Sequence, residues 1–429
     1  MRSRKNHAKL VRKINNCLEK EEFILKHKTS ESAFTRKRCF TFKSISLFII
    51  SSIQSGVQRE LDRFFGKYND TSISGQFVSK SAFSQARKKI CPEAFNELNR
   101  MTIDHFYSTC NYHKWKNHRL IAIDGSEVLL PPNQETIAEF GDYKTSRTKR
   151  NVVIARFSKS YDVLNRIAVD ARLTKRTNGE HYLAEQHLTY AQKNDLILLD
   201  RGYPSFTLFR IMLDRGCNFC FRLSVNNWKI AQELVTSDKK ESIVNIEVPK
   251  HLKKKFYKKH LDTSAIKLRL IKIKLKSGEY EVLITSLLDG KGYDHSCFRY
   301  LYNLRWGVEE SFKIDKHHLR LEDFSGYSVQ SIMQEFNAMI LLFNLASVFS
   351  YYPSKEIKKK VLKYKINITV AISKFRDNIV TIFKKMNEIG IIKKVMNAIF
   401  RNLTPIRDER CFERNVYRRR RYHYQYKNM

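Results

Sequence analysis

The sequence predicts a mixed α/β domain with helical regions on both sides of it. Short apolar runs typical of buried strands recur between residues 120 and 223, and segments with helical spacing separate the later ones. A β-like, very basic stretch follows, from 224 to 290. Apolar residues at helical spacing predict helices before and after these regions, at 42–65 and at 328–349. With 429 residues, of which 42% are hydrophobic, the chain can build roughly two to four domains around a substantial core.

The first predicted elements are basic and helical. Residues 1–40 are rich in Lys and Arg without a clear period, which indicates a loosely ordered arm or short helices. Phe42 to Phe65 predicts two short helices, and Ser79 to Lys89 predicts a helix capped by its first serine. Four side chains of the last helix are predicted to be available to DNA: Gln85, Arg87, Lys88 and Lys89. An ordinary basic surface helix fits this segment equally well.

Strands and helices then alternate as far as Leu223. Leu120 to Ile123 predicts a buried strand that ends at Asp124-Gly125-Ser126. Two strands, a helix, a strand, a helix and a strand are predicted after it, at Asn151–Phe157, Leu164–Ala171, Glu180–Gln192, Asp195–Leu199, Ser205–Arg215 and Asn218–Leu223. Asp200 directly follows one of these strands. The pattern by itself supports a mixed α/β domain and no particular topology.

The basic stretch from Ser224 to Gly290 predicts further strands. Its apolar residues alternate up to Leu270 and continue in the opposite phase from Ile271, which predicts a bulge between these two residues. Tyr280 to Leu287 predicts the next strand. The last predicted elements are a long helix, a helical region and a basic tail, at Ser328–Phe349, Glu356–Arg401 and Arg418–Arg421.

The charge of the chain predicts a polyanionic partner. Its 80 Lys and Arg residues face 43 Asp and Glu, which gives a formal net charge of +37. Nucleic acid is the leading partner and an anionic membrane surface is the competing one. The longest strongly apolar stretch, Met339 to Phe349, is too short to span a bilayer. We therefore expect no membrane segment.

The compartment expected from the sequence is the cytoplasm. The basic start is not followed by a continuous apolar segment, so no secretory signal is predicted. Eight scattered cysteines form no disulfide-like framework. Cys217 and Cys220 have the spacing of half a zinc site, but no second pair accompanies them, and we interpret them as core thiols.

The segment from Tyr302 to Lys316 carries the most specific pattern. On a helix, which advances about 100° per residue, Tyr302, Arg305, Glu309 and Lys316 fall in one narrow sector. An adjacent apolar sector lets the helix dock on a core while it displays this polar stripe along a cleft. A solvated charged face is the alternative for a helix of this kind.

Tyr302, Arg305, Glu309 and Lys316 have the spacing of the YREK signature, and the chain from about Phe77 to Phe349 resembles DDE transposases of bacterial insertion sequences, in the fourth family. The resemblance implies a ribonuclease H-like catalytic domain with a β-rich insertion. The implied organisation is a helical, basic DNA-end-binding region at 1–110, the first part of the catalytic core at 111–223, the insertion at 224–290, the second part of the core with the signature helix at 291–350, and a helical region with an Arg-rich tail at 351–429.

The resemblance also implies a catalytic site. Asp124, Asp200 and Glu309 would be the catalytic acids. They would hold two ions of Mg²⁺ or Mn²⁺, for which carboxylate oxygens are suitable ligands. Tyr302, Arg305 and Lys316 would bind DNA phosphate. The rival acids are Glu310, which lies about 100° away on the helix, and Glu127 and Asp170, which fit a supporting role better.

The implied reaction is cut-and-paste transposition. The element ends would be cleaved to expose 3′-hydroxyls, which then attack target DNA, in a homodimer that pairs two terminal inverted repeats of double-stranded DNA. The tryptophan that some relatives carry on the last insertion strand has no counterpart at Tyr280 to Ser286, so the sequence leaves a hairpin intermediate open. The two alternatives are a metal-dependent nuclease of the same fold without strand transfer and a non-catalytic DNA-binding derivative.

Overall fold

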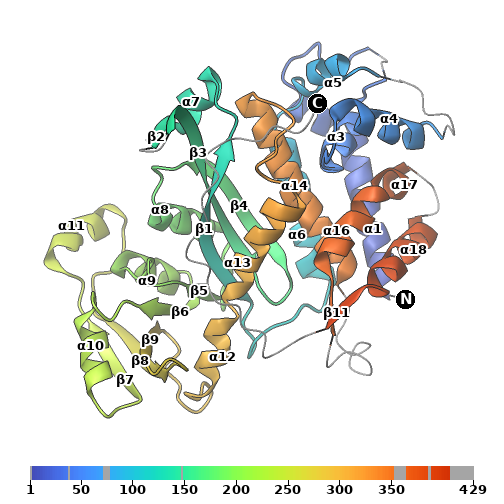
Figure 1. Cartoon of the computed structure of the whole chain (residues 1–429). Coiled ribbons are helices and arrows are strands. Elements are labelled where there is room, and N and C mark those ends of the chain that lie inside the picture. The colour runs from blue at the N-terminus through green and yellow to red at the C-terminus, as the bar shows by residue number, and fades with distance from the viewer. Residues whose placement is uncertain are drawn as a thin grey trace.

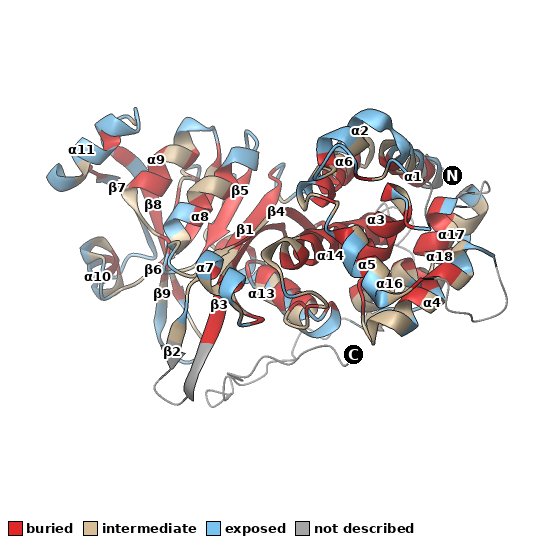
Figure 2. Cartoon of the chain, turned by 90° about the horizontal axis from the view of Figure 1, so that it is seen from above, coloured by how far each residue is buried: buried red, intermediate tan, exposed pale blue. Residues whose placement is uncertain are grey.

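The computed structural model describes residues 2–36, 39–70, 78–145, 148–351, 364–384 and 388–405. The predicted tail containing Arg418 to Arg421 and the first part of the helical region predicted from Glu356 lie outside these ranges. A large sheet occupies the middle of the molecule, with the N-terminal and C-terminal helices at one end and the insertion strands at the other (Figure 1). Seen from above, buried residues concentrate in the central strands and in one long helix beside them (Figure 2).

The central strands have the ribonuclease H-like order, which confirms the predicted fold class. They are β1 (Leu120–Leu130), β2 (Tyr143–Thr145), β3 (Thr148–Asp162), β4 (Ile167–Lys175), β5 (Leu196–Leu199) and β6 (Asn218–Leu223). β3 pairs antiparallel with β1 and with β4, whereas β5 pairs parallel with β1 and with β6. The crossovers carry α8 (Glu180–His187) and α9 (Phe206–Asp214). The sheet thus begins as an antiparallel meander and continues as parallel strands.

β1 is longer than predicted. The predicted end at Asp124 to Ser126 is wrong, because β1 stays paired with β3 as far as Leu130, opposite Val153. Its pairing with β5, however, stops at Ala122. Asp124 therefore lies in mid-strand with respect to β3 and beyond the paired residues with respect to β5.

The insertion strands extend the same sheet. β7 (Glu241–Ile246), β8 (Ile266–Lys274) and β9 (Tyr280–Thr285) add antiparallel strands beyond β6, in the order β9, β8, β7. The bulge predicted at Leu270–Ile271 is wrong, since β8 pairs with both neighbours without a register shift. The change of phase has another cause: β8 is buried on both faces here, and even Arg269 is only 2% exposed, with its guanidinium bonded to Glu241 and to the Tyr293 carbonyl.

Two helices accompany the insertion strands, α10 (Lys229–Thr236) and α11 (Lys250–Lys258). Five lysines of α11 are exposed: Lys250, Lys253, Lys254, Lys255 and Lys258. Phe256 anchors the helix in the core, while Tyr257 is 66% exposed beside the lysines. α11 is therefore a concentrated positive surface at the insertion end of the molecule (Figure 1).

The N-terminal region is helical as predicted. Its helices are α1 (Arg2–Glu19), α2 (Glu21–His27), α3 (Phe42–Ile50), α4 (Val57–Tyr68), α5 (Lys80–Arg87) and α6 (Glu93–Thr109). A further short helix, α7 (Gln134–Phe140), follows β1. The Ser79 hydroxyl caps α5 by accepting from the Ala82 amide. The predicted availability of Arg87 to DNA is wrong, because its guanidinium is buried and bonded to Gln334 and to Glu335 at 3.1 and 3.0 Å.

The partner of Arg87 is the core helix α14 (Val329–Ser350). α14 packs against α6, β4, α3 and α16. It is long and apolar enough, by length and composition only, to cross a membrane, but 94% of the apolar window is buried inside the protein. Such burial is what the central helix of a folded domain shows.

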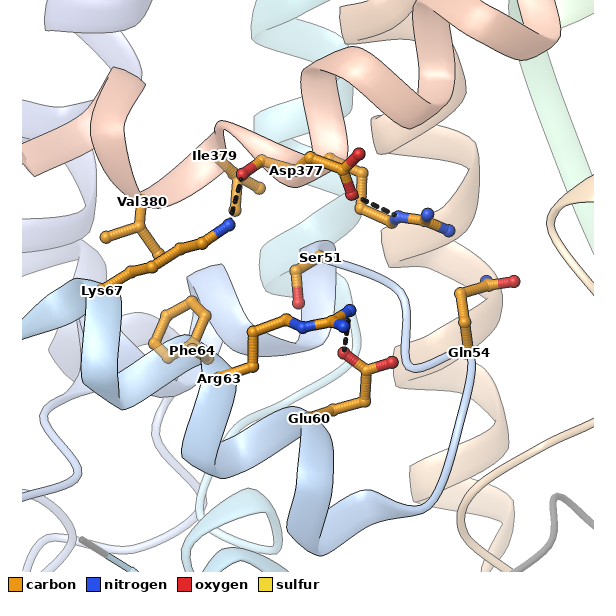
Figure 3. A pocket seen from close by; sticks show the side chains of 10 residues that line it. Ser51, Gln54, Glu60, Arg63, Phe64, Lys67, Asp377, Ile379 and Val380 are labelled. Carbon is orange, nitrogen blue, oxygen red and sulfur yellow. Dashed lines mark hydrogen bonds and ion pairs between the residues drawn. The ribbon is translucent and has the colours of Figure 1, made fainter. Parts of the chain in front are cut away.

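The C-terminal elements pack back onto the N-terminal helices. They are β10 (Tyr364–Ile366), α16 (Ile368–Asp377), α17 (Ile379–Lys384), α18 (Glu388–Phe400) and β11 (Leu403–Pro405). A pocket lies where α4 meets the junction of α16 and α17 (Figure 3). Each cation that lines it has a partner: Lys67 donates to the Asp377 carbonyl, Arg63 lies 3.9 Å from Glu60, and Arg376 lies 3.5 Å from the Asp377 carboxylate. We therefore interpret it as a helix junction.

Candidate active site

Asp124 and Asp200 lie at the same level of the sheet. Ala122 pairs with Leu198 in the parallel ladder of β1 and β5, so each aspartate comes two residues beyond a paired position. Each is followed by tight backbone: the Gly125 amide donates to Asp124 Oδ1, and the Gly202 amide donates to Asp200 Oδ1, both at 2.8 Å. Neighbouring strands lie about 5 Å apart, so the two carboxylates belong to one edge of the sheet.

Arg305 joins Glu309 to Asp124. Glu309 lies on α13 (Trp306–Lys313), which packs on β1. The guanidinium of Arg305 donates to Glu309 Oε1 at 2.7 Å and lies 3.5 Å from Asp124 Oδ2. α13 approaches the sheet closely at Gly307, where a β-carbon would lie 3.3 Å from Val163. The Arg305 side chain is 7% exposed, so this bridge is largely shielded from solvent.

The signature segment is not the single helix that was predicted. α12 (Cys297–Asn303) ends before a turn at Leu304 and Arg305, α13 follows, and a π-helical turn spans Ile314–His318. Leu304 and Arg305 keep helical backbone angles, so Arg305 and Glu309 still share a face. The π-helical turn alters the register before Lys316, whose ammonium donates to the Glu127 carbonyl.

The predicted polar stripe faces inward rather than along an open cleft. Tyr302 is 4% exposed, and its hydroxyl donates to the Leu199 carbonyl, directly before Asp200, at 3.3 Å. Arg305 points at two carboxylates. The structure thus brings Tyr302, Arg305 and Glu309 to the edge that carries the aspartates, and it places Lys316 farther along β1, next to Glu127.

The negative charges of Asp200 and Glu309 affect the pKa of Asp124. Burial raises the pKa of Asp124 to about 7, and the charges of Asp200 and Glu309 add to the rise, while the Gly125 amide and Arg305 oppose it. Among the described residues, no three Asp, Glu, His or Cys side chains are already gathered as metal ligands. The guanidinium between Asp124 and Glu309 stands where a cation would neutralise them. A hard divalent ion fits this set of carboxylates, with Arg305 as its stand-in.

The rival acids have other partners. Glu310 is exposed on the outer side of α13. Glu127 pairs with Arg176 at 2.8 Å. Asp170 accepts from Arg172 and from His187 Nδ1, each at 2.8 Å. These contacts support the preference for Glu309 and the supporting roles of the other two.

A buried relay connects Asp170 to the main chain of Asp124. His187 Nε2 lies 2.9 Å from the Ser158 hydroxyl, which donates to the Asp124 carbonyl at 3.4 Å. The arrangement resembles a hydrolytic triad, but Ser158 is 2% exposed and has no access to substrate. It holds the strand beneath Asp124. No sequence spacing signals this relay, because its members come from β3, β4 and α8.

The sequence interpretation also missed two residues at this edge, Glu180 and Tyr203. Glu180 is the first residue of α8 and lies beside both Gly125 and Gly202. Tyr203 is buried three residues after Asp200. The position of Tyr203 in Asp200-Arg201-Gly202-Tyr203 was a usable signal, whereas Glu180 looked like an ordinary acid in the first turn of a helix.

The sheet order and the helix facing its edge are those of a ribonuclease H-like protein. The chain belongs to the family described as Transposase DDE domain, whose sequence model matches residues 115–345, more than half of the chain. This confirms the predicted family.

An insertion-sequence transposase and a transposase of solved structure are among the proteins similar to the chain. Transposase InsG for insertion sequence element IS4, of Escherichia coli strain K12, is 23% identical over 271 residues, which are 63% of this chain. The chain thus spans about 60% of the length of that relative. A cryo-EM structure of the piggyBac transposase synaptic complex with hairpin DNA covers 91% of this chain and 85% of its own, at 10% identity and a TM-score of 0.47.

Asp124→Asn is expected to stabilise the metal-free chain at pH 8. The pKa of Asp124 lies above its ordinary value of 3.8, so its contribution to stability is present below about pH 4 and is lost as the pH rises to about 7. The variant removes this pH-dependent loss, which lowers the free energy of unfolding by up to about 4 kcal/mol in wild type. Urea unfolding from pH 4 to 8 should show a shallower loss of stability than in wild type, and identical slopes would contradict the assigned burial.

Proposed function

We propose that the chain is a DNA transposase that cleaves the ends of an insertion sequence and joins the 3′-hydroxyls to target DNA. The observation that carries this proposal is the convergence of Asp124, Asp200 and Glu309 on one sheet edge, with Arg305 between two of them. Membership of the transposase family supports it. The positive charge of the chain supports a nucleic-acid substrate.

The three acids are proposed to hold Mg²⁺ or Mn²⁺, as two ions. Such ions, when bound, polarise the phosphate and help to generate the attacking oxygen. Arg305 contacts both Asp124 and Glu309, and its planar guanidinium has the geometry to bind a DNA phosphate at two points. Lys316 is proposed to bind another phosphate of the same DNA, with its ammonium acting as a point charge.

Tyr302 is also proposed to take part in DNA binding. Because it is buried, we propose that it acts through its neighbour Arg305. Its ring lies 5.8 Å from the Arg305 guanidinium, and its hydroxyl is bonded to the strand that leads to Asp200. It therefore lies between Arg305 and the strand that leads to Asp200. If Arg305 turns toward a phosphate of the DNA end, that DNA would then lie next to the ring of Tyr302.

The proposed partners are the terminal inverted repeats and the target DNA, both double-stranded, bound by a homodimer in the bacterial cytoplasm. The exposed lysines of α11 and the basic N-terminal helices offer phosphate contacts at both ends of the molecule. Two active sites are needed to process two element ends, and a dimer supplies them.

A strand-transfer assay tests the function. Purified chain, Mn²⁺ and precleaved element ends should yield joined products with a target plasmid, and uncut ends should yield cleavage first. Cleavage without any joined product would favour the nuclease of the same fold. Specific binding of the ends without cleavage or joining would favour the non-catalytic derivative.

A further inference from the structure

A fourth carboxylate, Glu180, lies at the edge that carries Asp124 and Asp200. It opens α8, which packs on β1 and β3. A β-carbon at Gly125 would lie 3.4 Å from Glu180 Oε1, and one at Gly202 would lie 3.9 Å from Glu180 Oε2 and 3.2 Å from Asp200 Oδ1. Glu180 therefore reaches the backbone that follows both aspartates. A side chain at either glycine would stand directly against these carboxylates.

The loop after Asp200 is tied to the start of α8. His181 Nε2 lies 2.9 Å from the Gly202 carbonyl, and its ring centroid lies 6.1 Å from that of Tyr203. This contact links the first turn of α8, which carries Glu180, to the loop that follows Asp200.

The hydroxyl of Tyr203 points to a ligand that the protein does not supply. The side chain is 1% exposed, and its hydroxyl has no hydrogen-bond partner among the described residues. Tyr203 directly follows Gly202, whose β-carbon position lies next to Asp200 and Glu180. Burial raises the pKa of this phenol, and the charges of Glu180, Asp124 and Asp200 raise it further, while Arg156 opposes the rise. A buried hydroxyl without a partner is unfavourable, and an incoming oxygen ligand or water would remove that cost.

Arg156 holds Glu180 as Arg305 holds Glu309. Its guanidinium donates to Glu180 Oε1 at 2.6 Å, and its side chain is 19% exposed. A β-carbon at Gly125 would lie 3.8 Å from the same guanidinium. Two arginines thus neutralise two glutamates on either side of the aspartates.

We propose that Glu180 is a fourth carboxylate of the cation site, neutralised by Arg156 until a divalent ion is present, and that the Tyr203 hydroxyl donates to an oxygen ligand entering between Glu180, Asp124 and Asp200. This inference rests on the proposed function, since it assumes that the site takes a divalent cation. It assigns to Glu180 and Tyr203 roles that the DDE triad does not contain.

Mn²⁺ binding by the full chain without DNA tests the inference. Free Mn²⁺ is followed by electron paramagnetic resonance for wild type, Glu180→Gln, Asp124→Asn and the control Glu185→Gln. Glu185 lies on the same helix but pairs with Lys259. We expect Glu180→Gln to weaken Mn²⁺ binding by about 10-fold and Glu185→Gln to leave it unchanged. Thermal melting of each variant confirms that it is folded.

The outcomes separate the inference from the function beneath it. Equal Mn²⁺ affinity of Glu180→Gln and wild type, with binding lost in Asp124→Asn, would overturn the role of Glu180 and leave the proposed function intact. Unchanged binding in Asp124→Asn, or no uptake by wild type at millimolar Mn²⁺, would overturn both.

Arg156→Gln distinguishes a cation ligand from a merely structural acid. Freed from its partner, Glu180 should bind Mn²⁺ more tightly, so this variant is expected to raise the affinity about 3-fold or more. In the Glu180→Gln background the same substitution should have little effect. An equal gain in both backgrounds would mean that Arg156 acts only as a distant charge, and would overturn its role as the counterion of Glu180.

Discussion

Glu309→Gln is expected to lower Mn²⁺-dependent cleavage of element ends by roughly three orders of magnitude, on the scale of losing a charged group that stabilises the transition state. The amide keeps the shape of the side chain and removes its negative charge. That charge pairs with Arg305, which also contacts Asp124. Binding of uncleaved ends should fall little, because the basic surface that contacts phosphate is unchanged. The measurement is single-turnover cleavage alongside a gel-shift titration.

Glu310→Gln is the matched control. Glu310 is the next residue on α13 and is exposed, so its charge is screened by solvent and faces away from Arg305. Its loss should leave the cleavage rate within about 2-fold. If the two variants cleaved equally slowly, the assignment of Glu309 as the third acid would be wrong.

Asp200 was predictable from its neighbours, whereas the surroundings of Asp124 were only partly so. Leu196 to Leu199 are all fully buried, and the strand ends where the polar Asp200 begins. β1 instead continues beyond Asp124 as a strand paired only with β3, so its second half is partly exposed and lacks a continuous apolar pattern. Whether a strand has a paired strand on both of its sides depends on the tertiary structure, and a local sequence pattern does not predict it.

The signature shows the same limit. A period of about 3.6 residues places Arg305 and Glu309 on one face, and that much holds in the structure. The inward direction of Arg305 depends on Asp124, which is distant in the sequence. The π-helical turn that displaces Lys316 contains Asp315, which is buried against Lys159 of β3, a residue also distant in the sequence. Helical spacing could therefore find the residues but not the side to which they point.

Lys159→Met is expected to destabilise the protein by about 3–5 kcal/mol. Lys159 is fully buried on β3, where it pairs with Asp315. Burial lowers the pKa of this lysine and raises that of Asp315, and each partner opposes the shift of the other. The methionine fills similar space but leaves a buried carboxylate without its cation. Urea-induced unfolding at neutral pH measures the loss.

The pair also bears on the site, because Lys159 is the register partner of Asp124 and Asp315 directly precedes Lys316. The double variant Lys159→Met/Asp315→Leu should recover most of the stability, since a buried ion pair can often be replaced by apolar side chains. Lys20→Met breaks an exposed pair with Glu22 and should leave the stability of the protein unchanged. Recovery of both stability and cleavage in the double variant would show that the pair serves to hold α13 against β3. Recovery of stability without cleavage would show instead that the buried charges themselves tune Asp124. A single variant as stable as wild type would contradict the buried pairing from which both expectations derive.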